Sequence, residues 1–332
     1  MHEAALAQLL CDRFPSIDLV RFTNSGTEAN LLALATATMH TGRRGVLVFD
    51  GAYHGSLLAF ADGGIPINAP HDWVVGTYND IAGTERLVAE RGADVAAILV
   101  EPMLGSGGCV PGDPAFLAML RRTADDTGAV LIFDEVMTSR MTVGGQQYRL
   151  GITPDLTTLG KYLGGGMTFG AFGGRRDLMD VYDPRSAAAV PHSGTFNNNV
   201  LSMAAGHVGL SRLFTADVSD ALFRRGEHLR NDLNDLCAEA GVRMQWTGMG
   251  SLLTAHFQTE PIRAARDIQP QPELRELFHL DMLARGFYFA RRSMIALSLE
   301  IGDDECRSFC AAVAQFIEDR RELLIAQPAP VR

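Results

Sequence analysis

Short apolar runs alternate with longer amphipathic stretches over the first two-thirds of the chain. Four of these runs are almost wholly apolar and predict strands buried on both faces: Gly45–Phe49, Val95–Val100, 129–133 and 156–159. Apolar positions at helical spacing predict helices over 28–40, 114–126 and 199–213. Strands that alternate with helices in this way indicate the α/β class, with a mostly parallel sheet sandwiched by helices.

The pattern changes near residue 216. The elements expected beyond it are a charged amphipathic helix over 220–240, two strands within 245–257, a helix over 273–285, strands over 287–289 and 294–299, and a helix over 303–324. The segment 261–272 is polar and contains several prolines, so we expect a loop there. We therefore predict a large α/β domain over 1–215 and a smaller C-terminal α+β domain over 216–332.

Composition and charge narrow the class of protein. The 332 residues are 47% apolar and 20% charged, which is typical of globular proteins. The formal net charge of -10 argues against nonspecific binding to nucleic acid or to an anionic membrane. We find neither a signal peptide nor a long apolar span, and we expect a soluble, cytoplasmic protein. Five scattered cysteines without a zinc ligand set indicate reduced thiols and no metal.

The chain contains a single lysine. The other 28 of its 29 basic residues are arginines, and Lys161 is the exception. Only lysine offers an amine that can lose its proton and attack a carbonyl group. Lys161 follows a predicted strand and precedes glycine clusters at 164–166 and 170–174, which suggest backbone that closely approaches a bound group. A P-loop is excluded because Tyr162 stands where that motif has Ser or Thr. The alternative is an ordinary surface lysine.

Two further segments could bind parts of a ligand. Ser25, Gly26 and Thr27 precede a predicted helix, where N–H groups and hydroxyls can bind a phosphate. The alternative there is ordinary capping of the helix. Asp134 follows a predicted strand, at the edge where α/β sheets bind ligands. The alternative for this residue is an aspartate that caps the next loop.

Together these groups match one specific chemistry. A phosphorylated aromatic aldehyde needs an amine for a Schiff base, a cradle for its phosphate, and a carboxylate that keeps its pyridine nitrogen protonated. Lys161, residues 25–27 and Asp134 could supply these three groups in that order. The cofactor with these needs is pyridoxal 5'-phosphate.

Six segments spread over nearly the whole chain form a known set of motifs. They are Asn24-Ser-Gly-Thr-Glu-Ala29, Gly51-Ala-Tyr-His-Gly55, Val100-Glu-Pro102, Phe133-Asp-Glu-Val-Met137, Thr158-Leu-Gly-Lys161 and residues 165–174. This set resembles the class III aminotransferases, pyridoxal-phosphate enzymes of fold type I. Within the class the chain is similar to glutamate-1-semialdehyde aminomutases, and more closely to aromatic β-amino-acid (β-phenylalanine) aminotransferases. The closer similarity rests on residues 21–27, 136–140 and 192–199, and 196–199 depart from the aminomutase pattern.

The resemblance implies a role for each matching residue around the cofactor ring. Lys161 would hold the internal aldimine and then shuttle a proton. Asp134 would pair with the pyridinium nitrogen, while Val136 and Tyr53 would pack on the two faces of the ring. Two further residues are expected near the cofactor: His54 and Glu101.

The resemblance also implies how the phosphate and the substrate are bound. Residues 25–27 would bind the phosphate, together with Thr195 from the neighbouring subunit of a homodimer. In the β-amino-acid enzymes an arginine of the small domain lies near the site, and Arg292 matches its place. A guanidinium group suits a substrate carboxylate. Arg291 is the alternative in register, and an arginine exposed to solvent at a strand end is the other interpretation.

The activity implied is a ping-pong transfer of an amino group from an aromatic β-amino acid to a 2-oxo acid. The chain begins downstream of the usual start of family members, either as a naturally short form or from a truncated reading frame. The family's N-terminal segment supplies part of the substrate pocket. Two alternatives therefore stay open: an aminomutase reaction on the same cofactor, and a cofactor-binding protein with little turnover.

Overall fold

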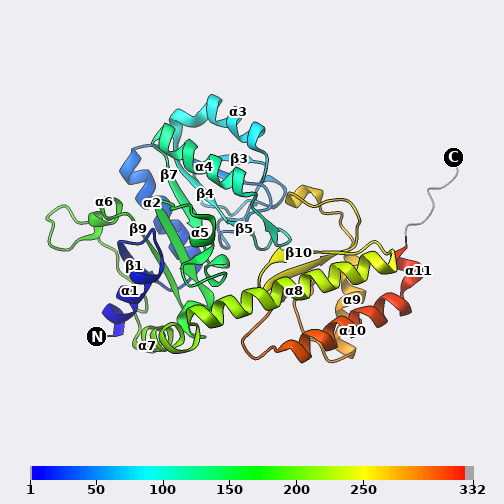
Figure 1. Ribbon diagram of the computed structural model, residues 1–332. Coiled ribbons are helices and arrows are strands. Elements are labelled where there is room, and N and C mark those ends of the chain that lie inside the picture. The colour runs from blue at the N-terminus through cyan, green and yellow to red at the C-terminus, as the bar shows by residue number, and fades with distance from the viewer. Residues whose placement is uncertain (1, 326–332) are drawn as a thin grey trace. The chain divides into compact units, whose positions relative to one another are not determined.

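The computed structural model describes residues 2–325, which divide into two compact units (Figure 1). The first unit holds the residues up to 107 together with 112–219, and the second holds 108–111 and the described residues from 220 onward. Helix α8 (Ala216–Ala240) carries the chain from the first unit into the second. Within residues 2–325, no helix is long and apolar enough to span a membrane.

A seven-stranded sheet lies at the centre of the first unit, in the order β1-β9-β8-β7-β4-β2-β3. Its members in that order are β1 (Leu19–Thr23), β9 (Gly170–Gly174), β8 (Leu156–Gly160), β7 (Val130–Asp134), β4 (Val95–Val100), β2 (Gly45–Phe49) and β3 (Asp72–Gly76). The strands from β8 to β3 run parallel, whereas β9 is antiparallel to both of its neighbours. Strands β2, β4, β7 and β8 are buried along their length, which confirms the predicted α/β sheet.

The helices of the first unit pack on the sheet through small or apolar side chains. Helix α2 (Gly26–Thr41) packs against β8 and β9 and buries Ala29, Ala33 and Ala37, whose small side chains permit a close approach. Helix α4 (Pro114–Thr127) packs against β4 and β7. The remaining helices are α1 (His2–Arg13), α3 (Ile81–Arg91), α5 (Gly145–Leu150), α6 (Arg176–Met179) and α7 (Val200–Val208).

The glycines of β9 explain why the sequence did not predict this strand. A Cβ atom on Gly170 would lie 2.2 Å from the carbonyl oxygen of Ser25, and one on Gly174 would lie 2.1 Å from that of Asp155. Both positions therefore exclude a side chain. The close approach expected at this glycine cluster is thus an approach to neighbouring protein backbone.

The second unit is built on a small antiparallel sheet in the order β10-β11-β12. Its strands are β10 (Gln245–Met249), β11 (Leu252–His256) and β12 (Met294–Ala296), and its helices beyond α8 are α9 (Pro272–Ala284), α10 (Asp303–Asp319) and α11 (Arg321–Leu324). Edge-to-face contacts of Trp246 with Phe278 and Phe309 fill the core of this unit.

The strand predicted over 287–289 is wrong. The N–H of Phe287 donates to the carbonyl oxygen of Met282, at the end of α9, so it takes part in capping that helix. Phe287 and Phe289 each make an edge-to-face contact with Phe309 on α10, while Tyr288 is exposed. The alternation of half-buried and exposed aromatic residues is therefore real, but it arises without a strand ladder. The expected helix over 303–324 is two helices, because α10 ends at Asp319 and α11 begins at Arg321.

The cysteines and acidic residues form no composite site within the described chain. All five cysteines are free thiols, with Cys109 and Cys237 buried. Burial raises the pKa of Cys237 to about 12, which makes its thiolate form scarce at neutral pH. Over residues 2–325, no group of three His, Cys, Asp or Glu side chains could hold a metal ion.

Candidate active site

Four neighbouring parallel strands end at one edge of the large sheet, and predicted site residues follow these ends. Asp134 is the last residue of β7, and Lys161 comes directly after β8. These two strands pair with Asp134 opposite Thr158. Glu101 comes directly after β4, and Tyr53 lies in the turn that follows β2. The topology thus gathers residues from distant parts of the sequence at the edge where α/β sheets bind ligands.

The N-terminus of α2 is both a capped helix end and a set of unused donors. Ser25 is the N-cap, and its hydroxyl oxygen accepts a hydrogen bond from the N–H of Glu28 at 3.2 Å. The backbone N–H groups of Gly26 and Thr27 have no acceptor among residues 2–325. They lie at the start of a 16-residue helix, where the helix dipole favours an anion. Capping of the helix and binding of a phosphate are therefore compatible at this segment.

Three donors converge on the buried carboxylate of Asp134. Its Oδ2 accepts from Nδ2 of Asn30 at 2.9 Å and lies 2.8 Å from Nδ1 of His54. Its Oδ1 accepts from the backbone N–H of Val136 at 3.0 Å. Asp134, Asn30 and His54 are all nearly inaccessible to solvent. The donors offset part of the cost of burying the negative charge.

Glu101 is a second buried carboxyl group at this edge. Its Oε2 accepts from the backbone N–H of Tyr53 at 3.0 Å, and its Oε1 accepts from that of Gly105 at 2.9 Å. Burial raises the pKa of Glu101 to about 7, against the lowering influence of His54, while the negative charge of Asp134 adds to the rise. Through its hydrogen bond with the N–H of Tyr53, Glu101 fixes the turn that carries Tyr53 and His54.

Val136 lies in the space that two glycines leave open. A Cβ atom on Gly26 would lie 2.9 Å from Cγ2 of Val136, and one on Gly160 would lie 3.3 Å from Cγ1. The first turn of α2, the Val136 side chain and the backbone just before Lys161 are therefore in direct contact. Tyr53 is 46% exposed, so a face of its ring is available to a flat ligand.

Lys161 is exposed and has an unusual backbone conformation. Its φ of 56° lies in the left-handed region, which is costly for any residue with a side chain. Such conformations concentrate at functional sites, where the surrounding structure holds them. The exposed side chain leaves the Nζ amine accessible to a carbonyl compound.

Thr195 lies in an exposed loop that is anchored beside the N-terminus of α2. In this loop, Nδ1 and the carbonyl oxygen of His192 accept from the Arg21 guanidinium at 2.8 and 3.0 Å. Oδ1 of Asn197 accepts from Nδ2 of Asn24, next to Ser25, at 2.8 Å. The loop is therefore fixed to its own subunit, while Thr195 itself faces outward.

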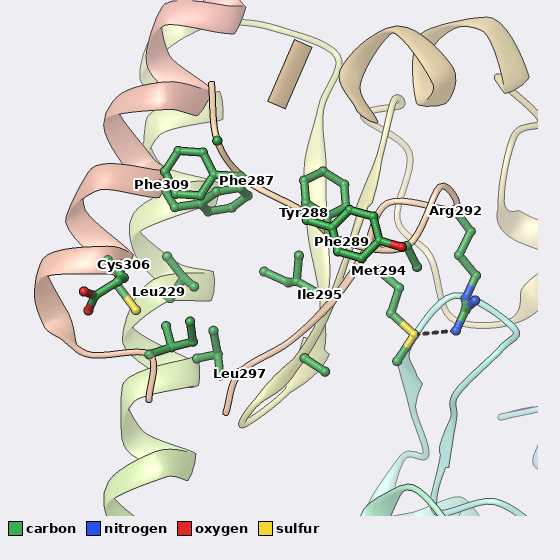
Figure 2. Close-up of a pocket in the computed structure, with 15 residues that line it drawn as sticks. Leu229, Phe287, Tyr288, Phe289, Arg292, Met294, Ile295, Leu297, Cys306 and Phe309 are labelled. Atoms are coloured by element: carbon green, nitrogen blue, oxygen red, sulfur yellow. Dashed lines mark hydrogen bonds between the residues drawn. The ribbon is translucent and has the colours of Figure 1, made fainter. Parts of the chain in front are cut away.

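Arg292 belongs to the second unit, at the rim of a cavity of about 650 Å³. Figure 2 shows its guanidinium beside Met294, with Nη2 3.1 Å from the Met294 sulfur. Within residues 2–325 it has no carboxylate partner, whereas the neighbouring Arg291 lies 3.6 Å from Glu276. Of the two arginines in alternative register, Arg292 is thus the one whose charge is not already paired.

These groups fit pyridoxal phosphate. The start of α2 offers free N–H donors for a phosphate, and Asp134 offers a buried carboxylate for a protonated ring nitrogen. Lys161 offers an accessible amine for the aldehyde. A mostly parallel sheet with the aspartate at the end of one strand and the lysine after its neighbour is the arrangement expected of a pyridoxal-phosphate-dependent enzyme of fold type I.

Comparisons with known proteins give the family. Residues 71–297 match the family model described as aminotransferase class III. The chain is 49% identical over 323 residues to a β-phenylalanine transaminase of Variovorax paradoxus, a match that covers 97% of this chain and 74% of the relative. It is 35% identical over 338 residues to a glutamate-1-semialdehyde 2,1-aminomutase of Lachnoclostridium phytofermentans, covering 96% and 79%. The chain belongs to the class III aminotransferases, which use pyridoxal phosphate.

A solved structure gives the same result for the fold. The crystal structure of a β-phenylalanine aminotransferase from Variovorax paradoxus matches with a TM-score of 0.96 and 48% sequence identity. The match covers 99% of this chain and 76% of that one. The predicted fold, cofactor and class of enzyme are thereby confirmed.

Two residues of the site were missed by sequence reasoning: Asn30 and Thr158. Oδ1 of Asn30 accepts from the Thr158 hydroxyl at 2.7 Å, and its Nδ2 donates to the carbonyl oxygen of His54 at 2.9 Å as well as to Asp134. The sequence feature that could have revealed Asn30 is its position: it is a polar residue on the buried, alanine-rich face of a helix, four residues after Gly26.

Proposed function

We propose that this aminotransferase takes an amino group from an aromatic β-amino acid and passes it to a 2-oxo acid such as 2-oxoglutarate or pyruvate. The observation that carries the proposal is the 49% identity to a β-phenylalanine transaminase over 97% of the chain. The motifs at 21–27, 136–140 and 192–199 support the same substrate class. The cycle is ping-pong, so the deaminated donor leaves before the acceptor binds.

The cofactor contributes electronic chemistry, and the protein holds it in place. Bound pyridoxal phosphate supplies an aldehyde for covalent attachment and a ring that withdraws electrons from the carbon that loses a proton. Asp134 keeps a proton on the ring nitrogen, which maintains this electron withdrawal. Ser25, Gly26 and Thr27 bind the phosphate at the start of α2. Val136 and Tyr53 hold the plane of the ring between them.

Lys161 has two tasks in this proposal. Its Nζ would hold the cofactor covalently, and as a free amine the same nitrogen would accept the proton that leaves the amine-bearing carbon of the donor. An exposed lysine at the end of a buried strand suits both tasks, because its backbone is fixed while its amine is accessible. As the single lysine of the chain, it has no substitute.

Arg292 is the proposed partner of the substrate carboxylate. A planar guanidinium binds a carboxylate through two parallel hydrogen bonds. The absence of a carboxylate partner for Arg292 within the described residues supports it over Arg291. His54 and Glu101 lie close enough to Asp134 and Tyr53 to fix them, and we propose that they act through those residues.

The working form is proposed to be a homodimer in which Thr195 of the partner subunit completes the phosphate site. The support is the outward-facing loop of Thr195 and a cluster of exposed apolar side chains beside it: Phe196, Val200 and Leu201, each more than 60% exposed. Such a surface is unusual on a monomer. A fully active monomer in light scattering would contradict this part of the proposal.

An aminomutase reaction is the second candidate, because the chain is 35% identical to a glutamate-1-semialdehyde aminomutase. The two activities differ in their need for an external acceptor. With β-phenylalanine as donor, we expect the corresponding 3-oxo acid to accumulate over many turnovers only when 2-oxoglutarate or pyruvate is added. Sustained conversion of glutamate-1-semialdehyde without any 2-oxo acid would instead establish the aminomutase.

A further inference from the structure

We propose that Asn30 is a positioning residue for the cofactor's ring nitrogen: it sets the Asp134 carboxylate so that one oxygen, Oδ1, is left to bind that nitrogen. The inference rests on the proposed role of Asp134 and assigns a task to a residue of α2 that the cofactor does not need to touch. Its basis is the count of hydrogen bonds around one buried carboxylate.

The count leaves one acceptor position on Asp134. An ionised carboxylate has about four, two on each oxygen. Asn30 and His54 both approach Oδ2, at 2.9 and 2.8 Å, and fill its two positions. The N–H of Val136 takes one position of Oδ1. The remaining position of Oδ1 is the one that can accept from a protonated ring nitrogen.

The orientation of the Asn30 amide is fixed by its partners. The carbonyl oxygen of His54 and the carboxylate of Asp134 can only accept, so Nδ2 must face both of them. The amide oxygen therefore faces Thr158, whose hydroxyl donates to it at 2.7 Å. All hydrogen-bonding groups of this buried amide are satisfied, so it has a single stable setting.

The amide also joins the elements that carry the site. Asn30 lies on α2 one turn after Gly26, Asp134 ends β7, and Thr158 lies on β8 three residues before Lys161. One side chain thus ties the phosphate-binding helix to the carboxylate and to the strand that leads to the lysine. An alanine at position 30 would free Oδ2 of Asp134 to rotate toward the cofactor and would leave the hydroxyl of Thr158 unpaired.

A purely structural role for Asn30 makes a different prediction from a positioning role. The test compares the affinity of the cofactor-free protein for pyridoxal phosphate with its affinity for an analogue in which the ring nitrogen is a CH group. Both molecules carry the aldehyde and the phosphate, so those contributions cancel in the ratio of the two affinities. The change in this ratio between the wild-type protein and a variant therefore reports the contact between Asp134 and the ring nitrogen.

We expect the wild-type protein to prefer pyridoxal phosphate and Asn30→Ala to lower the ratio by about tenfold, the effect of one hydrogen bond to a charged group. Thr158→Val, which keeps the volume but removes the hydroxyl that orients the amide, should lower the ratio in the same direction by less. Thr36→Val is the matched control: this buried hydroxyl on α2 bonds to Leu32 and Tyr182, away from Asp134, and the variant should keep the wild-type ratio.

The outcomes separate this inference from the function on which it rests. An equal loss of affinity for both molecules in Asn30→Ala and in Thr158→Val, with the ratio unchanged, would overturn the role of Asn30 and leave Asp134 in place. A wild-type protein that binds both molecules equally would overturn the role of Asp134 and the inference together.

Discussion

At Glu101, burial and hydrogen bonding shift the pKa of one carboxyl group in opposite directions. The two N–H donors of Tyr53 and Gly105 favour its charged form, but removal from water disfavours that form more strongly, and the pKa rises to about 7 from 4.5. Between pH 4.5 and 7, Glu101 is therefore protonated in the folded protein and ionised in the unfolded chain. Stability must fall as pH rises through this interval and become constant above it.

The matched variant for this effect is Glu101→Gln, which keeps the shape and cannot ionise. Relative to the variant, the wild-type protein should lose up to about 3 kcal/mol of unfolding free energy as pH rises from 4.5 to 7. Urea denaturation of both proteins without cofactor, at a series of pH values, measures this difference. A difference that is flat over the interval would show that Glu101 titrates normally.

Individual residues of the site differed in how visible they were in the sequence. Lys161 was identifiable because it is the single lysine, and Asp134 because it follows an apolar strand. Asn30 was not, since its task depends on Asp134 and Thr158, which lie more than a hundred positions away. Tertiary hydrogen bonds of this range leave no periodic pattern in one sequence.

At the scale of elements, prediction succeeded where hydrophobic burial alone determines structure. Strands β2 and β4 have the predicted bounds because every position in them is buried and apolar or small. Strand β9 escaped prediction because its glycines serve close backbone contacts. The segment 287–289 was predicted as a strand because capping of α9 and packing on Phe309 produce the same alternation of aromatic side chains.

Helix α2 is the element whose two roles can be separated by experiment. Ser25→Ala removes the N-cap hydroxyl and should cost about 1 kcal/mol of stability. If the start of α2 also binds the phosphate, Ser25→Ala and Thr27→Ala should weaken the binding of pyridoxal phosphate and leave that of pyridoxal, which lacks the phosphate, unchanged.

The control for this comparison is Glu28→Ala. It removes the carboxylate that accepts from the backbone N–H of Asn24 at 2.9 Å, and so loosens the same helix end without removing a phosphate donor. It should lower stability but keep the preference for the phosphorylated form. If all three variants kept the wild-type preference for pyridoxal phosphate over pyridoxal, this segment would serve only to cap the helix.

At the scale of the whole molecule, the site of the first unit is a product of sheet topology. The alternation of strands and helices predicted a parallel sheet, but not the strand order that places β8, β7, β4 and β2 side by side. That order brings the residues after four strand ends to one edge. The sequence motifs nevertheless identified the site residues, because their resemblance to the family implied which residues surround the cofactor.

The central claim is that Lys161 binds pyridoxal phosphate covalently and that an aromatic β-amino acid transfers its amino group to this cofactor. The most direct test is the visible absorption spectrum of the cofactor-loaded protein before and after addition of β-phenylalanine, with Lys161→Ala alongside. We expect the wild-type spectrum to change to that of the aminated cofactor and the variant to show no such conversion. A wild-type spectrum unaffected by β-phenylalanine would contradict the proposed donor, and conversion in Lys161→Ala at the wild-type rate would contradict the role of the lysine.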